Sequence, residues 1–330
     1  MRALNFTKPT IQFKKCKNIF PIPVTDYTFK QIFATERNKH FLINFLNSAI
    51  SKYVGVIADI TYLPTEKYGF EPLQKRVFFD IACKDTSDRE FIIEMQRAQQ
   101  PEFVDRSIYY LSRAISAGMK RGDDRYHLLP VYSVNLLDFN LPNFTNTDDC
   151  FSAVFLKDQK NEILTDKVGI FYLNLCNFAA QQEDISPELR QWLYVLKNMQ
   201  YFDETDYAQE AGIFKELLDE CRISKLNDME KEEYHKSVLE YEDVQEAIAY
   251  AKELAAEEAY GLGREEGREE GIEEGIEKGI EKGREEGRRS LLLTARKLLE
   301  KGMSLQDVLE ITGLSEIEVK SEIGSVSYIG

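Results

Sequence analysis

The sequence predicts an α/β fold in which a mixed sheet with helices on its faces is followed by an all-helical tail. Up to about residue 205, apolar runs of strand length alternate with stretches whose apolar residues recur at helical spacing. Two of these runs, 77–80 and 91–96, are joined by a polar stretch and read as two strands with a hairpin loop. Later residues are dense in Glu, Lys and Ala and contain few strand-like runs, which indicates helices.

The 330 residues divide into five predicted segments. An irregular segment with three prolines covers residues 1–23. The α/β domain covers 24–205, and a charged helical connector covers 206–260. A glycine repeat at 261–289 leads to a small helical module at 290–330.

The elements of the α/β domain can be predicted in order. Thr25 or Asp26 can cap a first helix whose apolar positions include Phe29, Ile32 and Phe33. The elements expected after it are a helix around 41–46, a strand at 54–63, the two strands that carry Asp80 and Glu94, a helix at 101–120, strands at 131–139, 151–156 and 168–175, and a helix at 187–199.

Asp80, Glu94 and Gln96 are the candidate functional residues on the two hairpin strands. Residues two apart along a strand point to one face, so Glu94 and Gln96 share a face that Asp80 can reach from the neighbouring strand. Two converging carboxylates form an oxygen-rich site suited to Mg²⁺. The alternative is a surface hairpin with solvated polar residues, in which Lys75 and Arg76 pair with the acidic groups.

A larger set of segments, in this order, resembles one family. The matching residues are Asp26-Tyr27-Thr28-Phe29-Lys30-Gln31-Ile32-Phe33, Phe79-Asp80-Ile81, Ile93-Glu94-Met95-Gln96, Arg106-Ser107-Ile108-Tyr109-Tyr110, Gly122, Tyr126 and a strand near 130–139. Over roughly residues 24–200 the chain resembles the bacterial recombination-promoting nuclease (Rpn) and putative transposase family. That family belongs to the PD-(D/E)xK nucleases, whose restriction-endonuclease-like fold is a mixed sheet flanked by helices.

The resemblance implies a metal-dependent DNA endonuclease associated with recombination or mobile elements. Asp80 and Glu94, with the Met95 carbonyl, would hold Mg²⁺ or Mn²⁺, and Gln96 would position the attacking water. Asp26 would add an acidic contact from the first helix. Complete transposition has no support of its own in the sequence.

Lys30 and Arg106 are the candidate contacts to DNA phosphates. Arg106 follows the Glu94 strand on the next helix, where it can bridge a catalytic carboxylate, contact a phosphate or form a surface ion pair. Tyr109 and Tyr110 are expected to be packing residues.

Two departures from the family pattern favour a rival function. Gln96 stands where the superfamily name places a Lys, although Glu-x-Gln is common in this family. The family's Glu-Leu-x-Lys-Phe-like segment reads Asn174-Leu175-Cys176-Asn177-Phe178 here. The rival is a degenerate nuclease-like scaffold that works as an oligomerising interaction protein through its helical tail.

The net charge of −15 is unevenly distributed, which removes an objection to DNA as the partner. Residues 1–200 carry 25 Lys and Arg against 23 Asp and Glu, a net of +2, while residues 201–330 carry 17 against 34, a net of −17. Basic side chains of the first part that can line a phosphate-binding face are Lys14, Lys15, Lys17, Lys30, Arg37, Lys39, Lys75 and Arg76.

The bulk composition indicates a cytoplasmic protein without a membrane partner. No N-terminal stretch resembles a secretion signal, and no apolar run is long enough to span a bilayer. The five cysteines are scattered and read as free thiols in a reducing compartment. The three histidines are too dispersed for a local zinc motif.

The tail contains seven glycines that recur every fourth residue, from Gly263 to Gly287. On a helix this line drifts by about 40° per repeat, and each glycine costs about 1 kcal/mol of helix propensity relative to Ala. Close helix contacts with a right-handed wrap are one interpretation, and a solvated helical spacer is the other. We expect a homo-oligomer through the C-terminal helices under the first interpretation.

The last segment resembles a helix-turn-helix in layout. A helix at 290–299 precedes one that Ser304 can cap and one that starts after Gly313. Its last two helices are acidic, which argues against phosphate contacts. The segment therefore has two interpretations, a packing or oligomerisation module and a DNA-binding domain.

Overall fold

The computed structural model describes residues 18–67, 77–98, 102–118, 127–141, 149–179 and 184–324. The chain divides into two compact units, residues 1–249 and 250–330. Several residues named from the sequence lie outside the described residues, namely Lys14, Lys15, Lys17, Lys75, Arg76, Gly122 and Tyr126.

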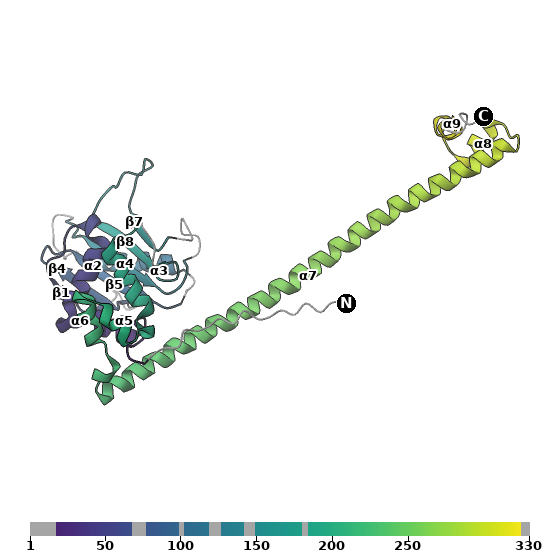
Figure 1. Ribbon diagram of the computed structural model, residues 1–330. Coiled ribbons are helices and arrows are strands. Elements are labelled where there is room, and N and C mark those ends of the chain that lie inside the picture. The colour runs from purple at the N-terminus through teal and green to yellow at the C-terminus, as the bar shows by residue number, and fades with distance from the viewer. Residues whose placement is uncertain are drawn as a thin grey trace. The chain divides into compact units, whose positions relative to one another are not determined.

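The first unit has the predicted alternation of helices and strands (Figure 1). Its helices are α1 (Asp26–Phe33), α2 (Lys39–Val54), α3 (Phe103–Gly118), α4 (Pro187–Asn198), α5 (Glu204–Gln209), α6 (Gly212–Glu220) and the start of α7 (Asp228–Glu300). Its strands are β1 (Ile60–Tyr62), β2 (Glu66–Lys67), β3 (Val77–Phe78), β4 (Ile81–Asp85), β5 (Glu90–Gln96), β6 (Val131–Leu137), β7 (Phe151–Phe155) and β8 (Val168–Asn174).

The sheet is mixed, which confirms the predicted α/β fold. Six strands lie in the order β1-β4-β5-β6-β8-β7, and β2 pairs separately with β3. β5 runs parallel to β6, and β6 runs parallel to β8, while the outer pairs are antiparallel. Helix α3 makes the crossover from β5 to β6 that a parallel pair requires.

Each face of the sheet is covered by a different apolar cluster. Alternate β5 residues, including Phe91 and Ile93, pack with α1, α2, α4 and α6 in the main core around Trp192. Ile92 lies on the opposite face with residues of α3, including Phe103 and Leu111. The alternation follows from the two-residue period of a strand. It places Glu94 and Gln96 on the α3 face.

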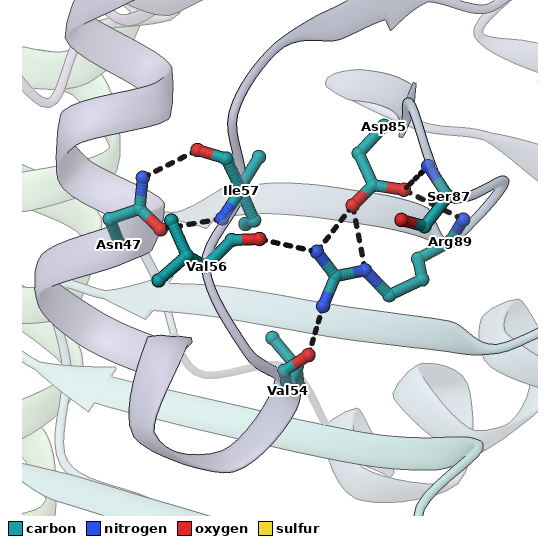
Figure 2. Close-up of polar contacts among 7 residues, drawn as sticks. All are labelled: Asn47, Val54, Val56, Ile57, Asp85, Ser87 and Arg89. Carbon is teal, nitrogen blue, oxygen red and sulfur yellow. Dashed lines mark hydrogen bonds and ion pairs between the residues drawn. The ribbon is translucent and has the colours of Figure 1, made fainter.

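The loop of the β4–β5 hairpin is held by a buried ion pair (Figure 2). Arg89 Nε lies 2.6 Å from Asp85 Oδ2, and the Asp85 side chain is 1% exposed. The Arg89 guanidinium also donates to the carbonyl oxygens of Val54, the last residue of α2, and of Val56 just after it. Asp85 Oδ1 accepts the backbone N–H groups of Ser87 and Arg89. The ion pair between Asp85 and Arg89 therefore connects the predicted polar loop to the end of α2.

The strand predicted at 54–63 is shorter than expected. Val54 still belongs to α2, which ends at Gly55 with φ +84°, and only Ile60–Tyr62 forms β1. Between Gly55 and Ile60 the backbone forms hydrogen bonds with side chains, where a neighbouring strand had been expected. Asn47 exchanges two hydrogen bonds of 2.8 Å with the backbone of Ile57 (Figure 2). Apolar, β-branched composition predicts extended backbone here, but it cannot reveal which partner the backbone takes.

The first core extends beyond residue 205. Phe214, Leu217 and Leu218 of α6 are buried in the main core, and Phe214 lies edge-to-face on Trp192 with ring centroids 5.0 Å apart. The first turns of α7 also contact α1 and the segment before it. Ser237 Oγ accepts the backbone N–H of Tyr27 at 3.1 Å, and Tyr234 Oη accepts that of Ile22 at 3.2 Å.

The second unit contains the rest of α7, α8 (Leu305–Thr312) and α9 (Glu316–Gly324). The helix predicted at 290–299 is not separate, because α7 continues through the glycine repeat to Glu300 (Figure 1). Ser304 caps α8 as predicted, and Gly313 ends it with φ +68°. Ala295, Val308, Leu314 and Val319 form a small core. Among the described residues, no helix is both long and apolar enough to span a membrane.

Candidate active site

Asp80, predicted on a strand at 77–80, lies in the bend between β3 and β4, because the strand that pairs with β5 begins at Ile81. From this bend Asp80 faces Glu94 of β5. β4 pairs with β5 so that Ile81 lies opposite Ile93. Extending this antiparallel register by one residue places Asp80 opposite Glu94. Asp80 Oδ2 accepts the backbone N–H of Met95 at 2.7 Å, so its carboxylate is directed toward β5.

Glu94 and Gln96 share the face predicted for them. Gln96 Nε2 donates to Glu94 Oε2 at 3.2 Å, and Glu94 is only 4% exposed. The other carboxylate oxygen, Glu94 Oε1, is buried and accepts no hydrogen bond from any described residue. A buried, unpaired carboxylate oxygen is costly unless the group is protonated or meets a cation.

The electrostatics of the pair oppose a double negative charge. Burial, followed by the charge of Asp80, raises the pKa of Glu94 to about 8, against the opposing effect of Arg106. Burial also raises the pKa of Asp80, and the charge of Asp26 adds to this effect. The Met95 N–H, Lys30 and Arg106 act in the opposite direction on Asp80. A divalent cation would relieve the repulsion between the carboxylates, so the donor set fits one.

A pocket of about 220 Å³ adjoins the pair. Its lining residues are Val24, Asp26, Asp80, Met95, Gln96, Arg97, Ala98, Arg106 and Val244. Five of the residues selected from the sequence therefore meet at one pocket. Glu94 does not line it but is linked to it through Gln96. Lys30 does not line it either and reaches the site through Asp26, with its Nζ 2.9 Å from Asp26 Oδ1.

Arg106 lies at the pocket and also contacts an aromatic ring. Its guanidinium carbon is 4.9 Å from the centroid of the Tyr110 ring. Tyr110 in turn packs edge-to-face on Phe79 with ring centroids 5.7 Å apart, in agreement with the packing role expected for it. The ring thus holds the arginine beside the carboxylates.

Arg97 is a pocket residue that the sequence analysis missed. Its Nη1 is buried and has no hydrogen-bond partner among the described residues. The two-residue period places the neighbour of Gln96 on the opposite face, so the pattern argues against it. β5 ends at Gln96, and the alternation does not apply to the residue that follows.

A buried polar row continues from Glu94 across the sheet. Glu94 is level with Asn135 of β6, and Asn135 is level with Tyr172 of β8. Tyr172 Oη lies 2.7 Å from Ser107 Oγ of α3. The sequence signal was Asn135, which with Ser133 is polar within a mostly apolar strand.

The start of α7 completes one side of the pocket. Val244 lines it, and Tyr241 Oη donates to Asp138 Oδ2 at 3.2 Å. The backbone N–H of Asp138 donates to the Gln96 carbonyl at 2.9 Å. Burial raises the pKa of Asp138 to about 6, and the Tyr241 hydrogen bond opposes the rise. Tyr241 and Asp138 are more than 100 residues apart in the sequence, so local sequence patterns do not predict their contact.

Two parts of the chain are similar to known protein families. Residues 23–251 match the model of the PD-(D/E)XK nuclease family transposase, which covers more than half of the chain. The chain belongs to this family. Residues 291–321 also match the C-terminal helix-turn-helix domain of the Rpn/YhgA-like nuclease family. The recombination-promoting nuclease family expected from the sequence is thereby confirmed. No curated protein and no solved structure matches the chain.

The match to the PD-(D/E)XK nuclease family extends to residue 251 and thus includes Tyr241 and Val244. The start of α7 therefore belongs to the family domain. The second match spans the end of α7, all of α8 and the first part of α9, whose small core is described above. The helix-turn-helix layout expected from the sequence is present in the family's own C-terminal domain, which indicates DNA as a partner.

Asn174 and Asn177, which depart from the Rpn pattern, have structural partners. Asn174 Oδ1 accepts the backbone N–H groups of Cys176 at 2.9 Å and Asn177 at 3.2 Å. This arrangement caps the turn that ends β8. Asn177 Nδ2 donates to the carbonyl of Asp149 at 3.3 Å.

PD-(D/E)XK nucleases generally use divalent metals. Within the described part of the chain, no group of three or more His, Cys, Asp or Glu side chains is placed to hold a metal ion. A metal at Asp80 and Glu94 would thus take its remaining ligands from backbone oxygen and water, which is the usual pattern for Mg²⁺.

Proposed function

We propose that this protein is a divalent-metal-dependent DNA endonuclease that hydrolyses phosphodiester bonds in recombination or in the movement of mobile elements. The observation that carries the proposal is the pair of half-buried Asp80 and buried Glu94 beside a pocket with two arginines. The family membership supports nuclease chemistry in general.

Asp80, Glu94 and the Met95 carbonyl are the proposed ligands for Mg²⁺ or Mn²⁺. Met95 directs its N–H toward Asp80, and the C=O of a strand residue leaves on the same side as its N–H. The Met95 carbonyl oxygen is thus suited to bind the metal beside the Asp80 carboxylate. When bound, the metal would supply charge stabilisation and would lower the pKa of a coordinated water.

Gln96 is the residue proposed to orient the water nucleophile. Its Nε2 is engaged with Glu94, which fixes the amide plane and leaves its Oε1 as an acceptor for a water proton. The water would attack phosphorus in line with the bond to the leaving oxygen, and that bond would break as the new P–O bond forms.

Arg97 and Arg106 are proposed to neutralise the phosphate. Gln96 brings no positive charge where the superfamily name places a Lys, and both arginines line the same pocket. The buried Nη1 of Arg97 has no protein partner among the described residues, which suits it to a phosphate oxygen. Lys30, paired with Asp26, would contact the flanking DNA backbone.

The test is cleavage of supercoiled plasmid DNA with Mg²⁺, Mn²⁺ or EDTA. We expect nicked and linear products with metal only, and a loss of at least ~100-fold in rate for Glu94→Ala and Glu94→Gln. Asp88→Asn is the matched control, because Asp88 is an exposed carboxylate of the same hairpin that pairs with Lys84.

Equal cleavage by wild type and both Glu94 variants would overturn the site assignment. Absence of cleavage together with absence of metal binding would instead support the degenerate scaffold, the rival function that Gln96, Asn174 and Asn177 favour.

A further inference from the structure

One edge of the six-stranded sheet is open. β7 is the last strand in the order, and among the described residues no strand lies against its outer side. Natural sheets protect such an edge with charges, proline or a very short strand. The opposite edge has this protection, because β1 has three residues and follows Asp59, whose charge pairs with Lys39. β7 has five residues, none of them charged and none of them proline.

The hydrogen bonds of β7 show which of its backbone groups point outward. The carbonyl oxygens of Cys150 and Leu156 accept hydrogen bonds from the β8 side of the hairpin, so the even-numbered residues direct their N–H and C=O groups toward β8. Phe151, Ala153 and Phe155 alternate with them and direct theirs outward. The outer edge thus presents three donors and three acceptors in a row.

The aromatic side chains of β7 leave this edge clear. The rings of Phe151 and Phe155 pack inward on Phe171 of β8, with ring centroids 6.3 and 5.7 Å away. Both rings also lie beside Tyr53 near the end of α2. Gly169 makes room for the Phe155 ring, since a Cβ atom at Gly169 would lie 2.9 Å from it. The outward backbone groups are therefore not covered by these rings.

We propose that β7 is a self-association edge, on which a second copy of the chain pairs antiparallel with its own β7 about Ala153. In this register Ala153 meets Ala153 of the second copy, and Phe151 lies opposite Phe155. All outward residues of both strands then pair, which gives about six backbone hydrogen bonds. The edge lies in the first unit and uses none of the residues proposed for the nuclease site, so the proposal goes beyond the proposed function.

The flanking charges favour this register. Asp149 lies just before β7 and Lys157 just after it, and both are exposed. Each is four residues from Ala153, so Asp149 of one copy is level with Lys157 of the other, twice in the dimer. A register shifted by two residues in either direction loses this opposition of charges and leaves an outward residue of each strand outside the five-residue overlap. The carboxylate of Asp158 accepts N–H groups of its own turn.

Pairing also covers exposed apolar side chains on the α3 face of the sheet. Val154 and Leu156 are 37% and 54% exposed and border an apolar groove of about 260 Å³ together with Ile108 of α3. In the proposed register, Ser152 and Cys150 of the second copy lie opposite Val154 and Leu156. Removal of this apolar surface from water adds to the hydrogen bonds of the edge.

Analytical ultracentrifugation of the full chain tests the edge with a substitution at its centre. Ala153→Pro removes an outward N–H and no bond to β8, and an edge strand tolerates proline at such a position. We expect this variant to have half the mass of the wild type. Ala153→Ser keeps the N–H and should associate as the wild type does.

Three results would overturn the proposal. One is a wild type that remains monomeric at the highest soluble concentration, which would leave the edge to a strand of another protein. The others are an Ala153→Pro variant that associates like the wild type, and an equal loss of association in Ala153→Pro and Ala153→Ser. Circular dichroism and thermal unfolding confirm that each variant is folded.

Disulfide cross-linking tests the register without removing any edge hydrogen bond. Ser152 of one copy lies opposite Val154 of the other in a non-hydrogen-bonded pair, whose Cα atoms are about 4.5 Å apart and can be bridged by a disulfide. We expect Ser152→Cys combined with Val154→Cys to form a covalent dimer on mild oxidation, while the wild type and each single variant stay monomeric on denaturing, non-reducing gels. If the double variant forms no dimer, or a single variant forms as much, the register about Ala153 is wrong.

Charge exchange provides a second test of the register. Asp149→Lys should raise the dissociation constant of the dimer by about 5-fold, because it places two lysines opposite each other at both ends of the paired strands. Adding Lys157→Asp to the same chain should restore the wild-type constant. An Asp149→Lys variant that associates like the wild type, or a double variant that does not recover, would show that Asp149 does not face Lys157.

Discussion

Asp80 Oδ2 accepts the backbone N–H of Met95 at 2.7 Å, and this bond holds one predicted metal ligand beside another. Glu94, opposite Asp80 in the extended register, has a buried oxygen, Oε1, without a hydrogen-bond partner in the described part of the chain. The resulting site is electrostatically unfavourable without a cation, and its stability should depend on pH and metal in a defined direction.

Glu94→Gln should stabilise the metal-free protein at alkaline pH. The folded-state pKa of Glu94 is raised to about 8 from an ordinary 4.5, so the folded state binds the proton more tightly than the unfolded state. Wild-type stability therefore falls between those two values as pH rises, by up to ~1.4 kcal/mol per pH unit. The amide variant lacks this loss. Thermal unfolding in EDTA at pH 5 and pH 9 should show its advantage at pH 9 only.

Metal should stabilise the wild type but not Glu94→Gln. Mg²⁺ or Mn²⁺ should raise the unfolding temperature of the wild type but leave Glu94→Gln nearly unchanged, because a ligand stabilises only the state that binds it. An equal shift in both proteins would place the metal elsewhere.

Arg97→Ala should reduce DNA cleavage by about 100-fold while metal affinity is retained. The guanidinium is proposed to meet the phosphate rather than the metal, so Arg97→Lys should recover part of the rate. Plasmid cleavage and Mn²⁺ titration on the same preparations separate the two effects. Loss of metal binding in Arg97→Ala would contradict this role.

Tyr241→Phe should destabilise the first unit more at pH 8 than at pH 5. The Tyr241 hydroxyl donates to Asp138, whose pKa is about 6, and a hydrogen bond to the ionised carboxylate is stronger than one to the acid. We expect a cost of about 2 kcal/mol at pH 8 and about 1 kcal/mol at pH 5. Denaturant unfolding measures both, with the exposed Tyr260→Phe as the control. A cost that does not change with pH would argue against a bond to the ionised Asp138.

Arg89→Met should destabilise the first unit by about 3–5 kcal/mol, because it leaves the Asp85 carboxylate buried without its partner. Lys84→Met breaks an exposed pair of the same hairpin with Asp88 and should cost at most about 1 kcal/mol. Chemical unfolding of both variants provides the comparison. Similar losses would mean that the Asp85 pair does not hold the loop.

Local periodicity predicted the part of the site that lies on the hairpin. The two-residue period placed Glu94 and Gln96 on one face, and Thr25, one of the two predicted candidates, caps the first helix. These features depend on neighbours in the sequence, which a pattern can show.

Features that depend on distant partners were not predicted. Tyr241 and Val244 reach the pocket from a helix far along the chain, and the backbone after α2 is satisfied by Arg89 and Asn47 rather than by a strand. Arg97 was missed because strand alternation ends one residue before it. Such contacts arise from tertiary structure, which overrides local preference.

Calorimetric titration of Mn²⁺ into the full chain at pH 7, in two buffers of different ionisation enthalpy, shows whether Asp80 and Glu94 hold a metal ion. We expect one site, with proton release, because Glu94 has a pKa of about 8 and must ionise to bind metal. Asp80→Asn and Glu94→Gln should each abolish binding, while Asp88→Asn should retain it. Binding without proton release, or binding that survives both site variants, would contradict the claim that Asp80 and Glu94 hold the metal.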